Sequence, residues 1–129
     1  MIQPWTSVVA ELQRRKGIGD EAWEASAGSV RQLATRIAEG PLNSLLFGWL
    51  SMHDLCIQQT DAPPYSVPYL RVSPSLSGDV EFHYFDTDTR AKQWHRTVPP
   101  HAVPGRFKAF LDQLHWITSK EAVDSLFTV

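Results

Sequence analysis

The pattern of apolar and polar positions changes near residue 61, from a repeat of three or four residues to a simple alternation. A repeat of three or four residues places apolar side chains on one face of an α-helix. It predicts helical structure through most of residues 1–59, with ends at Gly17 and Gly40, where glycine can terminate a helix. Asp20 can cap one of these helices, and a capping box at residues 29–32 predicts the start of another.

The longest predicted helix runs from Leu42 to about Gln59. Its apolar side chains cover most of the helix circumference, so it should be the central helix of the fold. His53 and Cys56 lie one turn apart on its apolar stripe. We expect His53 to be a buried, hydrogen-bonded histidine. We expect Cys56 to be a small core residue, because a reactive thiolate needs an exposed, electropositive setting.

Three segments of alternating polarity follow the first 64 residues. Residues 65–72, 80–85 and 93–98 each fit a β-strand, and polar turn segments separate them. Because the connections are short, an antiparallel meander is the favoured arrangement.

Two further helices are predicted after the strands. Pro104 can occupy the first turn of one helix, and a capping box at residues 118–121 can start the other. Helices, then strands, then helices indicate an α+β fold. The sequence thus predicts one compact domain over residues 1–129, with three N-terminal helices, a three-stranded antiparallel sheet and two C-terminal helices.

Composition narrows the classes of protein to consider. The chain has 129 residues, of which 43% are hydrophobic and 20% charged, which suits one core and excludes a disordered chain. The net charge of −2 disfavours nucleic acid as the main ligand, since phosphate binding needs clustered positive charge. A single cysteine, the absence of a signal peptide pattern and the lack of a long apolar run predict a cytoplasmic protein that has no membrane partner.

Two patterns that could indicate metal or phosphate chemistry lack residues or spacings that this chemistry requires. Residues 86–89, Asp-Thr-Asp-Thr, resemble the start of the phosphatase loop of haloacid dehalogenases, but Arg90 stands where that motif needs Thr or Val. We therefore predict a polar hairpin loop with Asx-type hydrogen bonds at this position. The five histidines show no metal-binding spacing, so no metal site and no cofactor are predicted.

One face of the predicted sheet gathers the residues that could carry a function. In a meander this face carries Tyr69, Arg71, Glu81, His83, Gln93 and His95, with Phe85 among them. The other face is apolar apart from Arg96. A shift of the predicted strand register by one residue would also explain this arginine.

Three interpretations of the polar face stay open. It is a solvated surface, a docking surface for a protein partner, or a catalytic site. As a docking surface it would use Tyr69, Arg71, Glu81, His83, Phe85, Gln93 and His95. As a catalytic site it would use Glu81 as base, His83 or His95 as acid and Arg71 on a phosphate.

The catalytic interpretation resembles the small microbial guanyl-type ribonucleases, which present Glu, Arg and His from an antiparallel sheet behind an N-terminal helix. The resemblance covers residue types and element order, without a shared motif.

The sequence favours a small protein-binding protein without enzymatic activity. A bacterial immunity protein that inhibits a nuclease-type toxin domain would fit, because acidic side chains steer a basic partner. The alternative is a small hydrolase or ribonuclease.

Overall fold

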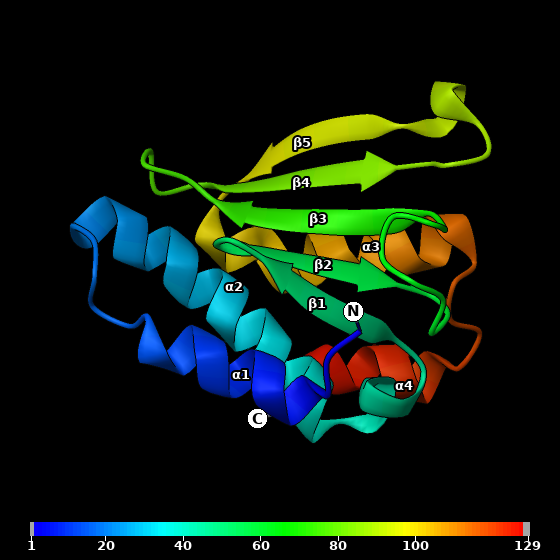
Figure 1. Cartoon of the computed structure of the whole chain (residues 1–129), viewed down its shortest axis with the longest axis horizontal. Coiled ribbons are helices and arrows are strands. Elements are labelled where there is room, and N and C mark those ends of the chain that lie inside the picture. The colour runs from blue at the N-terminus through cyan, green and yellow to red at the C-terminus, as the bar shows by residue number, and fades with distance from the viewer. Residues whose placement is uncertain (1, 128–129) are drawn as a thin grey trace.

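Five antiparallel strands form one sheet in the computed structural model, which describes residues 2–127 (Figure 1). The strands are β1 (Phe47–Ser51), β2 (Asp54–Gln58), β3 (Tyr69–Pro74), β4 (Val80–Phe85) and β5 (Trp94–Val98). Each strand pairs with the next one along the chain, so the sheet is a meander in the order β1-β2-β3-β4-β5. The predicted α+β class and antiparallel sheet are confirmed, but the prediction of three strands is wrong.

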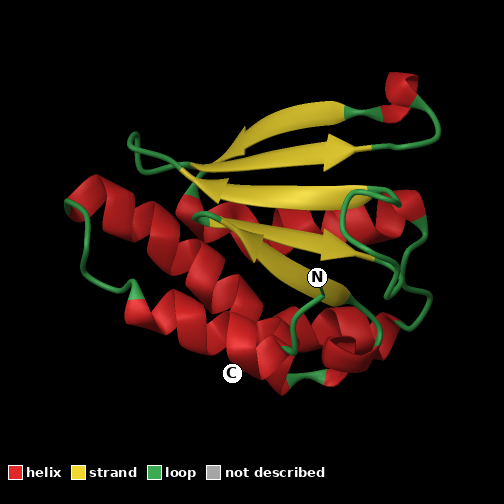
Figure 2. Cartoon of the chain, in the orientation of Figure 1, coloured by secondary structure: helices red, strands yellow, loops and turns green. Residues whose placement is uncertain are grey.

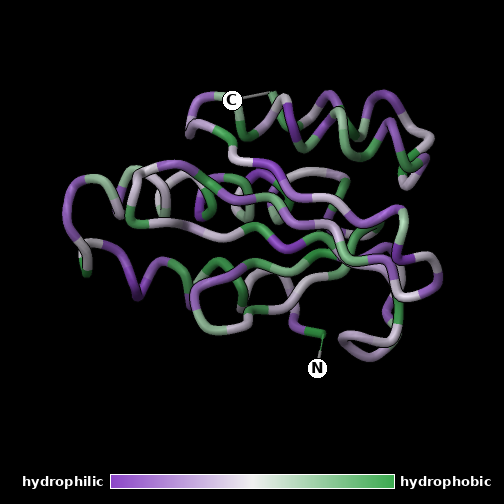
Figure 3. The backbone as a smooth tube through the Cα atoms, turned by 90° about the horizontal axis from the view of Figure 1, so that it is seen from above, coloured by the Kyte–Doolittle hydropathy of each residue, from purple (hydrophilic) through white to green (hydrophobic). Residues whose placement is uncertain are grey.

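Two α-helices precede the sheet and two follow it within the described residues. They are α1 (Trp5–Arg14), α2 (Glu21–Glu39), α3 (Val103–Leu114) and α4 (Lys120–Asp124). Figure 2 shows the helices in red and the strands in yellow. Viewed from the β5 side in Figure 3, the C-terminal helices lie on one side of the strands and the N-terminal residues on the other. The core between helices and sheet includes Leu33, Phe82, Phe107 and Phe110, all fully buried.

The second helix is continuous where two helices were predicted. Asp20 caps it as expected, since its carboxylate accepts a hydrogen bond of 2.9 Å from the backbone N–H of Trp23. The predicted capping box at residues 29–32 is wrong, because Ser29 lies inside the helix and donates its hydroxyl to the carbonyl of Ala25. Only two N-terminal helices result.

The predicted central helix over residues 42–59 is also wrong. A short 3₁₀ turn (Pro41–Ser44) and the β1–β2 hairpin occupy this segment. Both faces of the hairpin are covered: Leu55 and Ile57 face the helices, and Trp49 and Cys56 are buried on the other side. A strand that is buried on both faces loses its alternation, so its apolar run is easily mistaken for a helical stripe.

The two faces of the C-terminal strands are those expected from the sequence. Leu70, Val72 and Phe82 are buried against the helices, and Arg96 lies opposite Phe82 on the same side. Arg96 remains exposed because β5 is an edge strand, and its guanidinium lies 5.8 Å from the ring centroid of Trp94. The position of Arg96 on the helix side of the sheet is therefore explained by the edge position of β5, and not by an error in the predicted register.

Candidate functional site

The sheet face that carries no helix is the candidate site, and we call it the open face. Ile2, near the N-terminus, and Phe85 pack against a small apolar cluster at one end of this face. Trp49, Cys56 and Tyr69 form that cluster and are buried. The other end of the open face carries polar and charged side chains of β3, β4 and β5.

Six rings in contact extend over the open face from β1 to β5. This ring row consists of Tyr65, Trp49, Tyr69, Phe85, His83 and His95. Trp49 and Tyr69 have ring centroids 5.4 Å apart, and Tyr65 meets both edge-on. Tyr69 stacks on Phe85 at 4.9 Å, and Phe85 stacks on His83 at 4.0 Å. His83 then meets His95 at 5.4 Å, so each ring touches the next one in the row.

Arg71 is fixed toward the β1–β2 end of the open face. Its Nε donates to Oδ2 of Asp54 over 2.6 Å, and its Nη2 donates to the hydroxyl of Ser51 over 2.9 Å. These bonds occupy two of the donor nitrogens of the guanidinium, and they hold its charge next to a carboxylate.

A second polar pair lies at the β5 edge. Nε2 of His95 is 3.0 Å from Oε2 of Glu81, and the hydroxyl of Thr97 donates to the same oxygen over 2.8 Å. The side chain of His95 is 53% exposed, so solvent screens this pair. Glu81 thus engages two neighbours on β5.

His83 lies between the two polar pairs. Burial lowers the pKa of its imidazole, and the neighbouring His95 and Arg71 charges lower it further. His83 is therefore neutral near pH 7, and an uncharged ring stacks on Phe85.

The thiol of Cys56 is fully buried beneath this face, as the sequence predicted for a small core residue. Burial raises its pKa to about 12, which outweighs the opposite effect of the Arg71 charge. A thiol with this pKa is not a nucleophile at neutral pH.

Six of the seven residues predicted for docking lie on paired strands and share the open face, while the seventh, Gln93, lies outside the strands. Tyr69, Arg71, Glu81, His83, Phe85 and His95 are brought together by the strand register. Gln93 precedes β5, and its side-chain oxygen accepts the backbone N–H of Asp86 over 3.3 Å. It supports the β4–β5 loop, where Asp86 makes the predicted Asx-type bonds to the N–H groups of Asp88 and Thr89.

His53 does not lie where the sequence placed it. It is exposed in the β1–β2 turn and meets the ring of Trp23 edge-on, with centroids 5.3 Å apart. The predicted buried histidine is wrong because the helix that would have buried it does not exist.

The sequence did not identify Tyr65, Trp49 and Asp54 as parts of the site. Trp49 and Asp54 were assigned to a helix, which hid their place on the sheet. Tyr65 belongs to the loop between β2 and β3 and has a left-handed backbone, with φ of 69°. Such a conformation is uncommon for a non-glycine residue, and it presents the ring to Trp49 and Tyr69.

Two buried polar atoms at the end of the open face that carries the apolar cluster have no hydrogen-bond partner among the described residues. They are Nε1 of Trp49 and Oε1 of Gln58. Unpaired buried polar atoms cost free energy.

No protein family matches the chain, and no match was found among curated proteins or solved structures. Within residues 2–127, no three His, Cys, Asp or Glu side chains gather closely enough to hold a metal ion. No helix in this part of the chain combines the length and apolar character needed to cross a membrane.

Proposed function

We propose that this chain is a protein-binding protein without enzymatic activity, and that it docks its partner on the open face. The ring row is the observation that carries this proposal. Aromatic side chains dominate the centres of protein interfaces because they bury a large area at a small cost in side-chain entropy. A continuous row of rings across a helix-free sheet face offers such a centre.

The four rings of the row that are not buried support docking by a partner. Tyr65 and His95, at the two ends, are exposed, and Phe85 and His83 between them are partly exposed. Polar side chains border the row, as they border interface centres in general. Arg71 is among them, and its bonds to neighbouring side chains hold it in place before a partner arrives.

The same geometry gives less support to the hydrolase or ribonuclease alternative. That alternative needs Arg71, Glu81 and either His83 or His95 to act on one phosphate. Arg71 is instead bonded to Asp54 at the far side of the face, while Glu81 is bonded to His95 and Thr97 at the β5 edge. The cation and the acid–base pair are thus directed to different neighbours.

The inhibitor role predicted from the sequence, with a nuclease-type toxin as partner, stays a prediction. On the open face Arg71 pairs with Asp54, and Glu81 lies beside His95. Neither contact identifies a basic nuclease as the partner, so the proposal names a protein partner and no toxin class.

The test compares partner recovery by variants of the open face. Tyr65→Asn removes the ring at a position where Asn tolerates a left-handed backbone, and His95→Ala removes the other exposed end of the row. Lys120→Ala, at an exposed position in α4, is the matched control. Pull-downs from the native host should recover one protein with wild type and control, and much less with either face variant.

Binding is then measured with the two purified proteins by calorimetry. We expect each face variant to weaken binding by about tenfold or more, as truncation of an interface anchor does. A partner that binds the face variants and wild type equally would refute the open face as the docking surface. Turnover of a nucleic acid or ester substrate that His95→Ala abolishes would favour the hydrolase alternative instead.

A further inference from the structure

Three exposed apolar side chains gather at the end of the molecule where α1 leads into α2. Ile18 is 68% exposed, Met52 81% and Leu76 78%. Ile18 belongs to the α1–α2 loop, Met52 to the β1–β2 turn and Leu76 to the β3–β4 turn. We call them the loop-end patch. Three separate turns thus each bring a large apolar side chain to one end of the domain.

Two members of the loop-end patch, Ile18 and Leu76, line one hollow together with Trp23 and His53. The rings of Trp23 and His53 meet edge-on. Isolated apolar side chains are normal on a monomer surface, whereas several around one hollow mark an interaction site.

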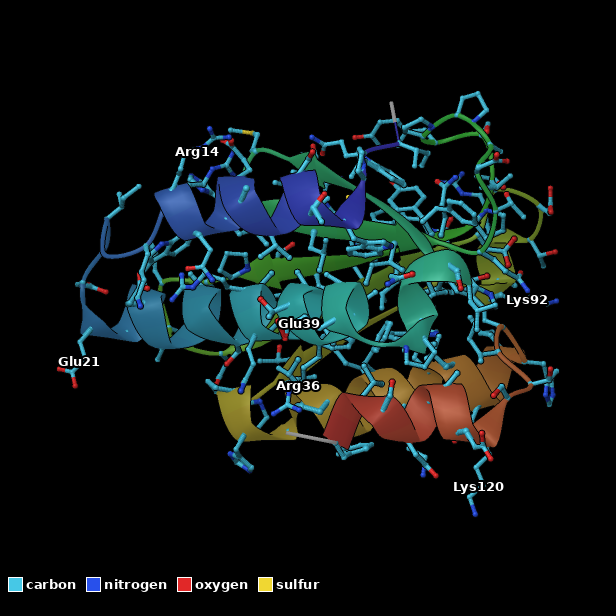
Figure 4. All side chains as sticks on the ribbon, turned by 90° about the horizontal axis from the view of Figure 1, so that it is seen from below. Arg14, Glu21, Arg36, Glu39, Lys92 and Lys120 are labelled. Carbon is cyan, nitrogen blue, oxygen red and sulfur yellow. The ribbon has the colours of Figure 1, made fainter. Side chains whose placement is uncertain are left out.

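Charges of opposite sign flank the patch on two sides. Arg14 and Lys16 lie at the end of α1, while Glu21 and Asp79 line a second hollow at the start of α2 and the β3–β4 turn. Figure 4 shows Arg14 and Glu21 at the same end of the molecule and well apart. Within residues 2–127, Lys16, Glu21 and Asp79 form no ion pair, and Arg14 is paired only with Glu11 while largely exposed.

We propose that a second copy of this chain docks on the loop-end patch, with a two-fold axis through its apolar centre. A two-fold interface joins the same surface of both copies, so it requires a surface that is complementary to itself. An apolar centre between a basic and an acidic flank meets this requirement. The two-fold rotation places Arg14 and Lys16 of one copy against Glu21 and Asp79 of the other.

The edge strand β5 is a poorer place for self-association. An antiparallel pair of β5 strands centred on Arg96 would bring the two Arg96 side chains together, and like charges directly opposite are destabilising. The loop-end patch is thus the better surface for a second copy.

Sedimentation velocity of the purified full chain over a range of concentrations tests the apolar part of the proposal. We expect a monomer–dimer equilibrium that Leu76→Ser and Ile18→Ser weaken by about tenfold or more. Leu45→Ser, at an exposed leucine away from the patch, is the matched control and should leave the equilibrium unchanged. Circular dichroism confirms that each variant is folded. A wild-type chain that stays monomeric up to about 1 mM would overturn the proposal.

A charge-swap experiment tests the two-fold arrangement. One variant carries Glu21→Lys and Asp79→Lys, and the other carries Arg14→Glu and Lys16→Glu. Each variant alone should be monomeric, because like charges then face each other at both flanks. An equal mixture should form a heterodimer, since every flank then meets its opposite. Dimers that neither variant weakens, or a mixture that does not associate, would overturn the arrangement.

The test of dimerisation and the test of partner binding on the open face can fail independently of each other. Tyr65→Asn and His95→Ala change the open face and should leave dimerisation intact. Loss of dimerisation in Leu76→Ser should likewise not depend on whether a partner protein is found.

Discussion

The indole ring of Trp5 lies directly over Gly48, and the two residues fix α1 to the β1 edge of the sheet. A Cβ atom on Gly48 would lie 2.7 Å from Cη2 of Trp5, closer than packed atoms approach. The indole Nε1 donates to the carbonyl of Leu46 over 2.9 Å, and this hydrogen bond holds the ring in place against Gly48. The backbone of Gln3 also bridges to Gly48, which covers the strand edge.

Gly48→Ala should therefore lower the free energy of unfolding by about 1–3 kcal/mol, the usual cost of overpacking a buried contact. Urea unfolding followed by tryptophan fluorescence measures the change. Gly105→Ala is the matched control, because a Cβ on Gly105 meets no atom within 4 Å and the residue lies inside α3. It should stabilise the chain by about 0.5–1 kcal/mol. A Gly48→Ala variant as stable as wild type would show that Trp5 can move aside.

Cys56 should react with thiol reagents only when the chain unfolds. The side chain is fully buried, and a pKa of about 12 leaves almost no thiolate near pH 8. The rate of labelling by a disulfide reagent should match the opening rate of the sheet and should rise steeply with urea. Rapid labelling without denaturant would contradict the packing of Trp49 and Tyr69 around the thiol.

The accuracy of the sequence-based prediction depended on how many faces of each strand are buried. β3 and β4 bury mainly one face, so their alternation of polar and apolar residues indicated the strands and the side of the sheet that holds the core. The β1–β2 hairpin is buried on both faces and turns at Met52 without glycine or asparagine, so neither the period nor the turn indicated it.

The candidate site was predicted in part for the same reason. Arg71, Glu81, His83 and His95 lie on strands that were recognised, and the register does place them on one face. Their bonding partners were not recognised, because Ser51 and Asp54 belong to the hairpin that was mistaken for a helix. Contacts with a loop, such as that of Tyr65 with Trp49, depend on tertiary packing and have no periodic signal.

Asp86→Ala should destabilise the chain by about 1–3 kcal/mol, because it leaves several donors without an acceptor. The carboxylate accepts the hydroxyl of Tyr84 over 2.9 Å and the N–H groups of Asp88 and Thr89 over 2.9 and 2.7 Å. Asp86→Asn keeps an acceptor oxygen and should cost less.

Urea unfolding of the Asp86 variants measures these differences, with Asp88→Ala as the exposed control. If Asp86→Ala and Asp88→Ala were equally mild, the β4–β5 loop would not depend on the Asp86 carboxylate.

His83 should make the stability of the chain fall as the pH is lowered below about 7. In the unfolded chain its pKa is about 6.5, whereas burial and the charges of His95 and Arg71 lower it in the folded chain. The unfolded state therefore binds more protons between the two pKa values. The contribution of neutral His83 is complete above the unfolded pKa and is lost as the pH falls through this window.

The measurement compares urea unfolding of wild type and His83→Gln at about pH 7.5 and pH 5.5. Gln cannot titrate, so the variant should lose less stability between these values than wild type does. His101→Gln, an exposed histidine away from the ring row, is the control and should retain the wild-type slope. Equal slopes for wild type and His83→Gln would refute the lowered pKa.

The same titration bears on docking, because a proton on His83 adds a positive charge between Arg71 and His95 and beneath any partner seated on the ring row. Desolvating that charge is costly, so partner affinity should decrease from about pH 7.5 to pH 5.5 in wild type, and less so in His83→Gln.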